Sequence, residues 1–125
     1  MSYVRVWVHL VFSTKNRETL LKKEIREQIR QHIKENCKEK GIFLQAINGY
    51  EDHLHCLISL GCDQTIAKVA QMIKGESSYW INKNKLVPGE FMWQNEYYAN
   101  SVSESEKRKI ESYIRNQEKK HAISG

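Results

Sequence analysis

An alternation of apolar and polar side chains opens the chain and predicts a β-strand. Across residues 3–13 the even positions from Val4 to Phe12 are all apolar, whereas the odd positions are mixed and include His9. Successive side chains of a strand point to opposite faces. One face of this strand should therefore enter the core, and His9 should lie on the other face, where it either approaches a functional site or faces water.

The hydrophobic period then lengthens and predicts a helix over residues 22–40. Its apolar side chains recur at every fourth position and form one stripe along an otherwise charged segment. Gly41 follows as the residue that ends the helix. The stripe consists of Ile25, Ile29, Ile33 and Cys37.

Two further strands are expected over residues 42–48 and 53–60, and the short turn at 49–52 makes them a hairpin. A second helix should begin at a cap provided by Asp63 or Thr65 and run to about residue 82. An irregular fourth strand at 96–102 should follow.

The last helix is expected over about residues 104–120, capped by Ser103 or Ser105. The resulting order is β-α-β-β-α-β-α, of which the first six elements are the ferredoxin-like split βαβ order. We therefore predict an α+β fold in which two helices pack on a four-stranded antiparallel sheet, with an additional C-terminal helix. Many unrelated functions use this fold, so it does not identify an activity.

Composition places this chain among single-domain proteins. Its 125 residues are 40% hydrophobic, which is enough for one core spanning residues 1–125, and the net charge of +5 weakly favours a polyanionic partner. No apolar run approaches the roughly 20 residues of a membrane span, and the first residues lack a signal-peptide pattern. A cytoplasmic protein without membrane association is expected. Three cysteines without C-x-x-C spacing indicate reduced thiols.

The main candidate for chemistry is the pair His53 and His55 in the third strand. Residues two apart share a face of a strand, so the two imidazoles would project together about 7 Å apart. Two neutral imidazoles can hold a divalent metal ion. The alternative is that both are ordinary polar residues on a half-exposed strand.

The last helix supplies a second candidate, Tyr113 and Gln117, which lie one turn apart. An amide oxygen is a suitable third ligand for Mg²⁺ or Mn²⁺. A metal held in this way would polarise a phosphodiester, and a nearby tyrosine could attack its phosphorus. The alternative is that Tyr113 is a partly buried aromatic residue whose hydroxyl contacts water.

Five fragments, in this order, resemble the small single-tyrosine HUH transposases of bacterial and archaeal insertion sequences, the transposase-200-like family. Together they extend over most of the chain. They are residues 9–17 (HLVFSTKNR), 53–55 (HLH), 74–78 (KGESS), 93–102 (WQNEYYANSV) and 113–117 (YIRNQ). The chain differs from many relatives in having Lys120-His121 where two adjacent histidines are common, so no role is assigned to His121.

The resemblance implies an enzyme that cleaves and rejoins single-stranded DNA at the ends of a mobile element. It implies that His53, His55 and Gln117 bind Mg²⁺ or Mn²⁺, and that Tyr113 becomes linked to a 5′ phosphate. It also implies a homodimer that recognises a DNA hairpin, without indicating whether the tyrosine helix serves its own chain or the partner.

Basic and aromatic side chains elsewhere in the chain are candidates for supporting roles. The basic residues expected to contact phosphate are Lys15, Arg17, Lys74 and Lys83. The rival nucleophiles Tyr97 and Tyr98 lie in a strand without a partner at helical spacing, which favours core or interface positions.

Three other functions share parts of this pattern. A replication initiator or relaxase would have the histidine pair, but such proteins are usually larger and often carry two tyrosines on the nucleophile helix. A domesticated protein could bind DNA hairpins with little or no transposition activity. An RNA-binding ferredoxin-like module would need exposed aromatic residues on the central strands, where this chain has Leu57 and Ser59 beside the histidines.

Overall fold

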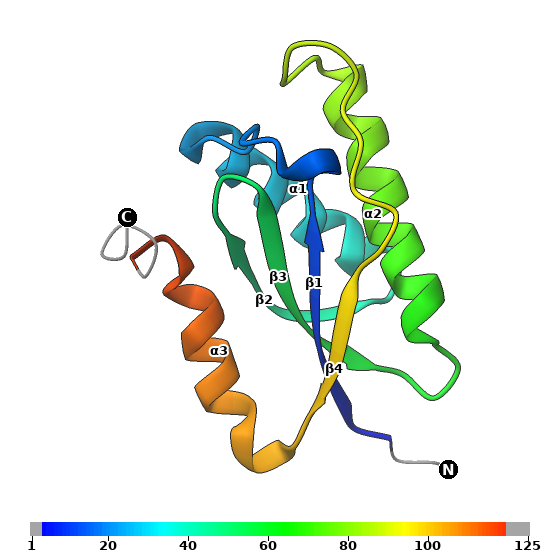
Figure 1. The fold of residues 1–125 in the computed structure, drawn as a ribbon. Coiled ribbons are helices and arrows are strands. Elements are labelled where there is room, and N and C mark those ends of the chain that lie inside the picture. The colour runs from blue at the N-terminus through cyan, green and yellow to red at the C-terminus, as the bar shows by residue number, and fades with distance from the viewer. Residues whose placement is uncertain (1–3, 120–125) are drawn as a thin grey trace.

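The computed structural model describes residues 4–119, and its elements follow the predicted order (Figure 1). Tyr3 and residue 120, at the ends of the first predicted strand and last predicted helix, lie outside this range. The strands are β1 (Val6–Ser13), β2 (Phe43–Gly49), β3 (His53–Leu60) and β4 (Tyr98–Val102). The helices are α1 (Lys23–Glu39), α2 (Ile66–Lys83) and α3 (Lys107–Arg115), with short 3-10 turns at Lys15–Arg17 and Glu104–Glu106.

The four strands form one antiparallel sheet in the order β2-β3-β1-β4. This is the ferredoxin-like arrangement that the split βαβ order predicts. β3 is paired on both sides, with His55 opposite Val11 of β1 and Asn48 of β2. The predicted fold class is therefore confirmed, and the histidine strand is a central strand.

Both faces of the sheet are covered, although unequally. Even-numbered residues of β1, such as Leu10 and Phe12, pack with the inner sides of α1 and α2 in the main core. Odd-numbered Trp7 packs instead with Leu57 and with Ile114 of α3 in a smaller cluster. Figure 1 shows α1 behind the sheet, whereas α3 runs beside β2. Because side chains alternate in direction along β1, its even positions face the main core and its odd positions face the side that α3 covers.

Element ends differ from the sequence prediction in ways that have local causes. β1 begins only at Val6, and β4 only at Tyr98, where pairing with Val11 starts. Thr65, and not Asp63, caps α2, because its side chain accepts a hydrogen bond from the Lys68 backbone N–H at 3.2 Å.

The last helix is interrupted near its end. α3 begins at Lys107 after a 3-10 turn and ends at Arg115, because Asn116 leaves helical geometry (φ −99°, ψ 16°). Residues 117–119 are helical again, so Gln117 lies just after the break, whereas the sequence placed it on one continuous helix with Tyr113.

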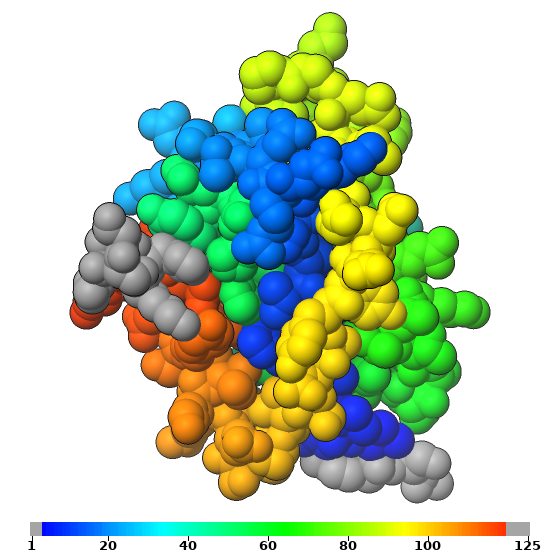
Figure 2. Space-filling view, in the orientation of Figure 1, coloured from blue at the N-terminus to red at the C-terminus, as the bar shows by residue number. Residues whose placement is uncertain are grey.

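The three cysteines are free thiols. Cys37, from the predicted apolar stripe of α1, and Cys56 are buried, whereas Cys62 is exposed. No helix in the described part of the chain is long and apolar enough to cross a membrane. In the space-filling view, β4 and the segment before it run along the surface (Figure 2).

Candidate metal and nucleophile site

His53 and His55 lie on the sheet face that α3 covers, and both are at least nine-tenths buried. Their ring centroids are 5.0 Å apart with an interplanar angle of 75°. The prediction that they share a face is therefore correct. The alternative of a half-exposed strand is wrong, because central pairing and α3 enclose this part of β3.

A carboxylate fixes the first of these imidazoles. Asp52 Oδ1 lies 2.7 Å from His53 Nδ1, and its other oxygen accepts a hydrogen bond from Arg17 Nε at 3.0 Å. Burial alone would raise the pKa of Asp52, but the hydrogen bonds from His53 and Arg17, with their charges, leave that pKa below its usual value. Arg17 holds this contact from a left-handed backbone conformation (φ 56°), which costs free energy for a residue with a side chain.

A third histidine orients the second imidazole. His9 Nε2 lies 2.8 Å from His55 Nδ1, and the two rings stack with centroids 5.1 Å apart. Burial lowers the pKa of His9, which favours its neutral form. Of the two positions that the sequence left open for His9, the structure selects the one at the site.

Tyr113 reaches the histidines from α3 of the same chain. Its ring centroid is 5.6 Å from that of His55 and 6.2 Å from that of His9, and both contacts are edge-on. The tyrosine side chain remains 39% exposed, so a substrate can approach it from solvent. Residues about sixty positions apart in the sequence therefore meet in one place.

Gln117 follows Tyr113 by four residues and is the more buried of the two. Its side chain is almost fully buried, and Nε2 donates to the Tyr113 carbonyl oxygen at 3.3 Å. Its Oε1 is buried without a hydrogen-bond partner among the described residues. A turn at Asn116 interrupts the helix between the two residues.

The available donors fit a divalent metal that prefers nitrogen and oxygen ligands. Within residues 4–119, no three His, Cys, Asp or Glu side chains are grouped to hold a metal ion. A site at the two histidines would therefore need an oxygen ligand of another type. The partnerless amide oxygen of Gln117 is such a ligand. The two histidines use Nδ1 for Asp52 and His9, and ligating histidines almost always bond a second group through one ring nitrogen in this way.

Sequence reasoning missed Asn48 and Asp52. Asn48 lies opposite His55 in the β2–β3 pair, is buried, and donates from Nδ2 to the Arg115 carbonyl oxygen at 3.0 Å. Asp52 immediately precedes the histidine pair, and that adjacency was the signal available in the sequence. Nothing in the local pattern marked Asn48, because its importance depends on the strand register.

The predicted phosphate-binding residues have different surroundings. Arg17 contacts Asp52 beside the histidines, and Lys15 Nζ lies 4.0 Å from Met92 Sδ at the surface. Lys74 donates to the carbonyl oxygens of residues 94 and 95, and burial lowers its pKa. It therefore holds the segment before β4. Lys83 lies over the Tyr79 ring at the end of α2.

The rival tyrosines are exposed and not in the core. Tyr98 is 59% and Tyr97 38% exposed, and Lys74 lies 5.7 Å from the Tyr97 ring centroid. Neither belongs to the ring cluster around His55, which within the described residues includes Tyr113. The geometry therefore separates Tyr113 from its rivals.

Comparisons with known proteins agree on one family. The profile described as "Transposase IS200 like" matches residues 2–117. The chain is similar to ISDra2 transposase TnpA of Deinococcus radiodurans, with 27% identity over 118 residues that cover 90% of this chain and 84% of the relative.

Two solved structures have the same fold. One is a Deinococcus radiodurans R1 protein described provisionally as a transposase, with a TM-score of 0.74, 25% identity, and coverage of 94% of this chain and 95% of that one. The other is a REP-associated tyrosine transposase bound to a REP hairpin, with a TM-score of 0.71, 17% identity, and coverage of 97% and 72%.

Proposed function

The chain belongs to the IS200-like transposase family, and from that premise we propose that it cleaves and rejoins single-stranded DNA at the ends of a mobile element. Tyr113 is the proposed nucleophile. The observation that carries this proposal is the approach of the Tyr113 ring to His55 and His9, at 5.6 and 6.2 Å between centroids. The exposed part of Tyr113 provides access for DNA.

The proposed metal ligands are His53, His55 and Gln117, with Mg²⁺ or Mn²⁺ as the ion. When bound, the ion would supply Lewis-acid polarisation of a phosphodiester oxygen. Asp52 and His9 hold the two imidazoles in orientation through their Nδ1 atoms. These contacts support a metal-binding arrangement, because ligating histidines almost always use their second nitrogen in this way.

In the proposed reaction, the Tyr113 hydroxyl oxygen attacks phosphorus and the bond to the 3′ oxygen breaks. The products are a 5′-phosphotyrosine and a free 3′ hydroxyl, so the phenol loses a proton and the 3′ oxygen gains one. An ordinary tyrosine has a pKa of about 10, so the positive charge around the site must assist ionisation. Attack by a 3′ hydroxyl on the phosphotyrosine reverses the chemistry and rejoins DNA.

We also propose that the DNA partner carries a hairpin and that the active form is a homodimer. The REP-associated relative, which shares the fold, was solved with a hairpin. Arg17 and Lys15 lie near the start of β3, where they can contact phosphate groups. Such contacts would give salt-dependent affinity without reading sequence.

The test is to incubate the protein with single-stranded DNA from its own element ends and Mn²⁺, and to look for a covalent adduct on a denaturing gel. We expect an adduct with the original protein and with Tyr97→Phe, and none with Tyr113→Phe. The Tyr97→Phe protein is the matched control, because it removes an exposed tyrosine hydroxyl from the same chain. An adduct that persists in Tyr113→Phe would contradict the assignment.

A further inference from the structure

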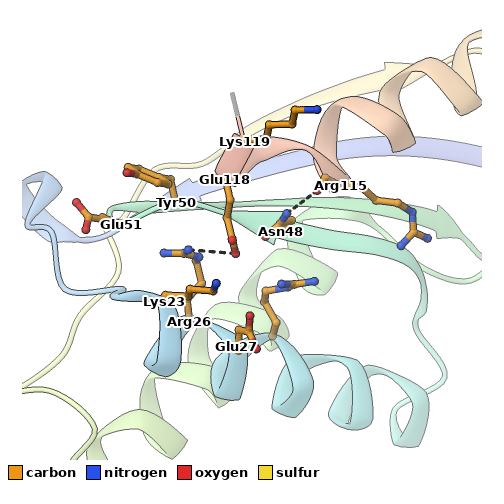
Figure 3. Close-up of a pocket in the computed structure, with 10 residues that line it drawn as sticks. Lys23, Arg26, Glu27, Asn48, Tyr50, Glu51, Arg115, Glu118 and Lys119 are labelled. Atoms are coloured by element: carbon orange, nitrogen blue, oxygen red, sulfur yellow. Dashed lines mark hydrogen bonds and ion pairs between the residues drawn. The ribbon is translucent and has the colours of Figure 1, made fainter. Parts of the chain in front are cut away.

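A pocket of about 670 Å³ lies between α1, the end of β2 and the end of α3 (Figure 3). It opens beside the candidate site. Asn48, which lines the pocket, is the β2 partner of His55, and Arg115, also in the lining, follows Tyr113 by two residues. Its volume is within the range of small-molecule sites. The pocket therefore adjoins the strand pair that carries His55 and the last turn of α3.

Cations outnumber carboxylates in the lining. Lys23, Arg26 and Arg30 come from successive turns of α1, and Arg115 comes from α3. Arg30 Nε donates to the Ile47 carbonyl oxygen at 3.0 Å, which leaves four of its five N–H donors for other partners.

Two of the three carboxylates in the lining are paired with cations, Glu118 with one inside the pocket and Glu51 with one outside it. Glu118 forms an ion pair with Arg26 at 3.1 Å, Glu51 is paired with Lys22 at 3.3 Å, and Arg115 is paired with Glu111 outside the pocket. Glu27 lines the pocket as well and opposes anion binding. Figure 3 shows Glu118 reaching from the end of α3 toward α1, whereas Lys119 points away.

Two buried polar atoms in this lining have no hydrogen-bond partner within residues 4–119. Arg26 is only 3% exposed; its terminal nitrogens bond Leu21 and Glu118, but Nε has no partner among the described residues. The same is true of Asn48 Oδ1. Buried polar groups are nearly always satisfied in native proteins. A donor and an acceptor left over in one pocket therefore indicate a ligand with complementary groups.

We propose that this pocket is a nucleotide subsite, which binds a phosphate group of single-stranded DNA and the nucleoside next to it, beside the phosphodiester that meets Tyr113. The α1 cations and Arg26 Nε suit phosphate oxygens, and Asn48 Oδ1 suits an N–H group of a base. The inference rests on the proposed function, since it assigns the path of that DNA substrate.

The experiment measures binding of 5′-fluorescein-labelled dT12 by anisotropy, in EDTA and with Tyr113→Phe as the background, so that no cleavage occurs. Lys23→Gln should weaken binding severalfold and reduce the salt slope by about 0.7, the value for one phosphate contact on a single strand. Glu27→Gln should strengthen binding. Both side chains are exposed, so the variants should fold.

Lys38→Gln and Glu39→Gln are the matched controls, because they make the same charge changes at the other end of α1, outside the pocket. The proposal requires larger, opposite effects at Lys23 and Glu27 than at these controls. Equal effects in the two pairs would overturn it. If the variants show these binding differences but the protein forms no covalent adduct, the proposed catalysis is rejected and the subsite stands. If the adduct forms but the variants show no such differences, the subsite is rejected and the proposed catalysis stands.

A second measurement locates the ligand by NMR with thymidine 3′,5′-bisphosphate as the probe. We expect the Arg26 Nε–H and Asn48 side-chain amide signals to shift on titration, and the shifts to weaken in Lys23→Gln. Shifts confined to residues outside the pocket would contradict the proposal.

Discussion

At the scale of single residues, the site combines groups that the sequence could identify with others that it could not. The period of two in β3 was sufficient to place His53 and His55 together. Their partners Asp52 and His9 depend on the turn geometry and on the pairing of β1 with β3. Spacing therefore predicted the pairing of the proposed metal ligands, and tertiary structure supplied the groups that orient them.

Asp52→Asn should weaken Mn²⁺ binding about 10- to 100-fold, the usual cost of losing a partner that orients a ligand. The amide replaces a charged acceptor of His53 Nδ1 with a neutral one. Titration calorimetry with Mn²⁺ measures this directly. Glu51→Gln is the control, since its carboxylate pairs with Lys22; equal losses in both variants would show that Asp52 has no orienting role.

Gly49→Ala should destabilise the fold by about 1–3 kcal/mol, the typical cost of overpacking. An added Cβ would lie 2.0 Å from the His53 carbonyl oxygen, which is backbone and cannot rotate away. Urea denaturation measures the loss. Gly75→Ala is the control, because nothing lies within 4 Å of its Cβ position and alanine favours a helix. If Gly49→Ala were as stable as that control, the close approach would be absent.

At the scale of elements, the sequence predicted every helix and strand in order but did not predict the interruption of the last helix. Periodicity over residues 104–120 did not reveal the break at Asn116, because polar residues occupy helix ends and helix surfaces alike. Gln117, just after this break, is buried, whereas Tyr113, just before it, remains partly exposed. Helical spacing alone did not predict this difference in exposure.

Ile114→Ala should cost about 2–5 kcal/mol, as for other fully buried isoleucines. Ile114 is completely buried and anchors α3 to the smaller core cluster that contains Trp7. Loss of this anchor should also change Trp7 fluorescence and reduce adduct formation at the adjacent Tyr113. Ile110→Ala, at a partly buried position of the same helix, should cost less; the reverse order would contradict the described docking of α3.

At the scale of the whole molecule, helices pack on both faces of the sheet. The strand order places β3, which carries the histidines, in the centre and β4 at one edge. The composition and the β-α-β-β-α-β-α order were enough to predict this architecture. The pocket between α1 and α3 was not predictable, because it depends on how α3 crosses the face that α1 and α2 do not cover.

The closed core predicts the reactivity of the thiols. Burial, with a smaller contribution from Glu76, raises the pKa of Cys37 to about 11, and burial raises that of Cys56 as well. The thiolate is the reactive form, so at pH 8 both should resist Ellman's reagent while exposed Cys62 reacts. One thiol should titrate in the folded protein and three in urea. Rapid reaction of all three in native buffer would contradict the packing.

The central claim, that Tyr113 attacks the phosphodiester, is tested most directly by mass spectrometry of the trypsin-digested DNA adduct. Cleavage after Lys109 and Arg115 gives the peptide IESYIR, in which Tyr113 is the single tyrosine, whereas Tyr97 and Tyr98 lie together in residues 86–107. The account predicts that the nucleotide mass is attached to IESYIR. Attachment to the peptide of residues 86–107 would contradict it.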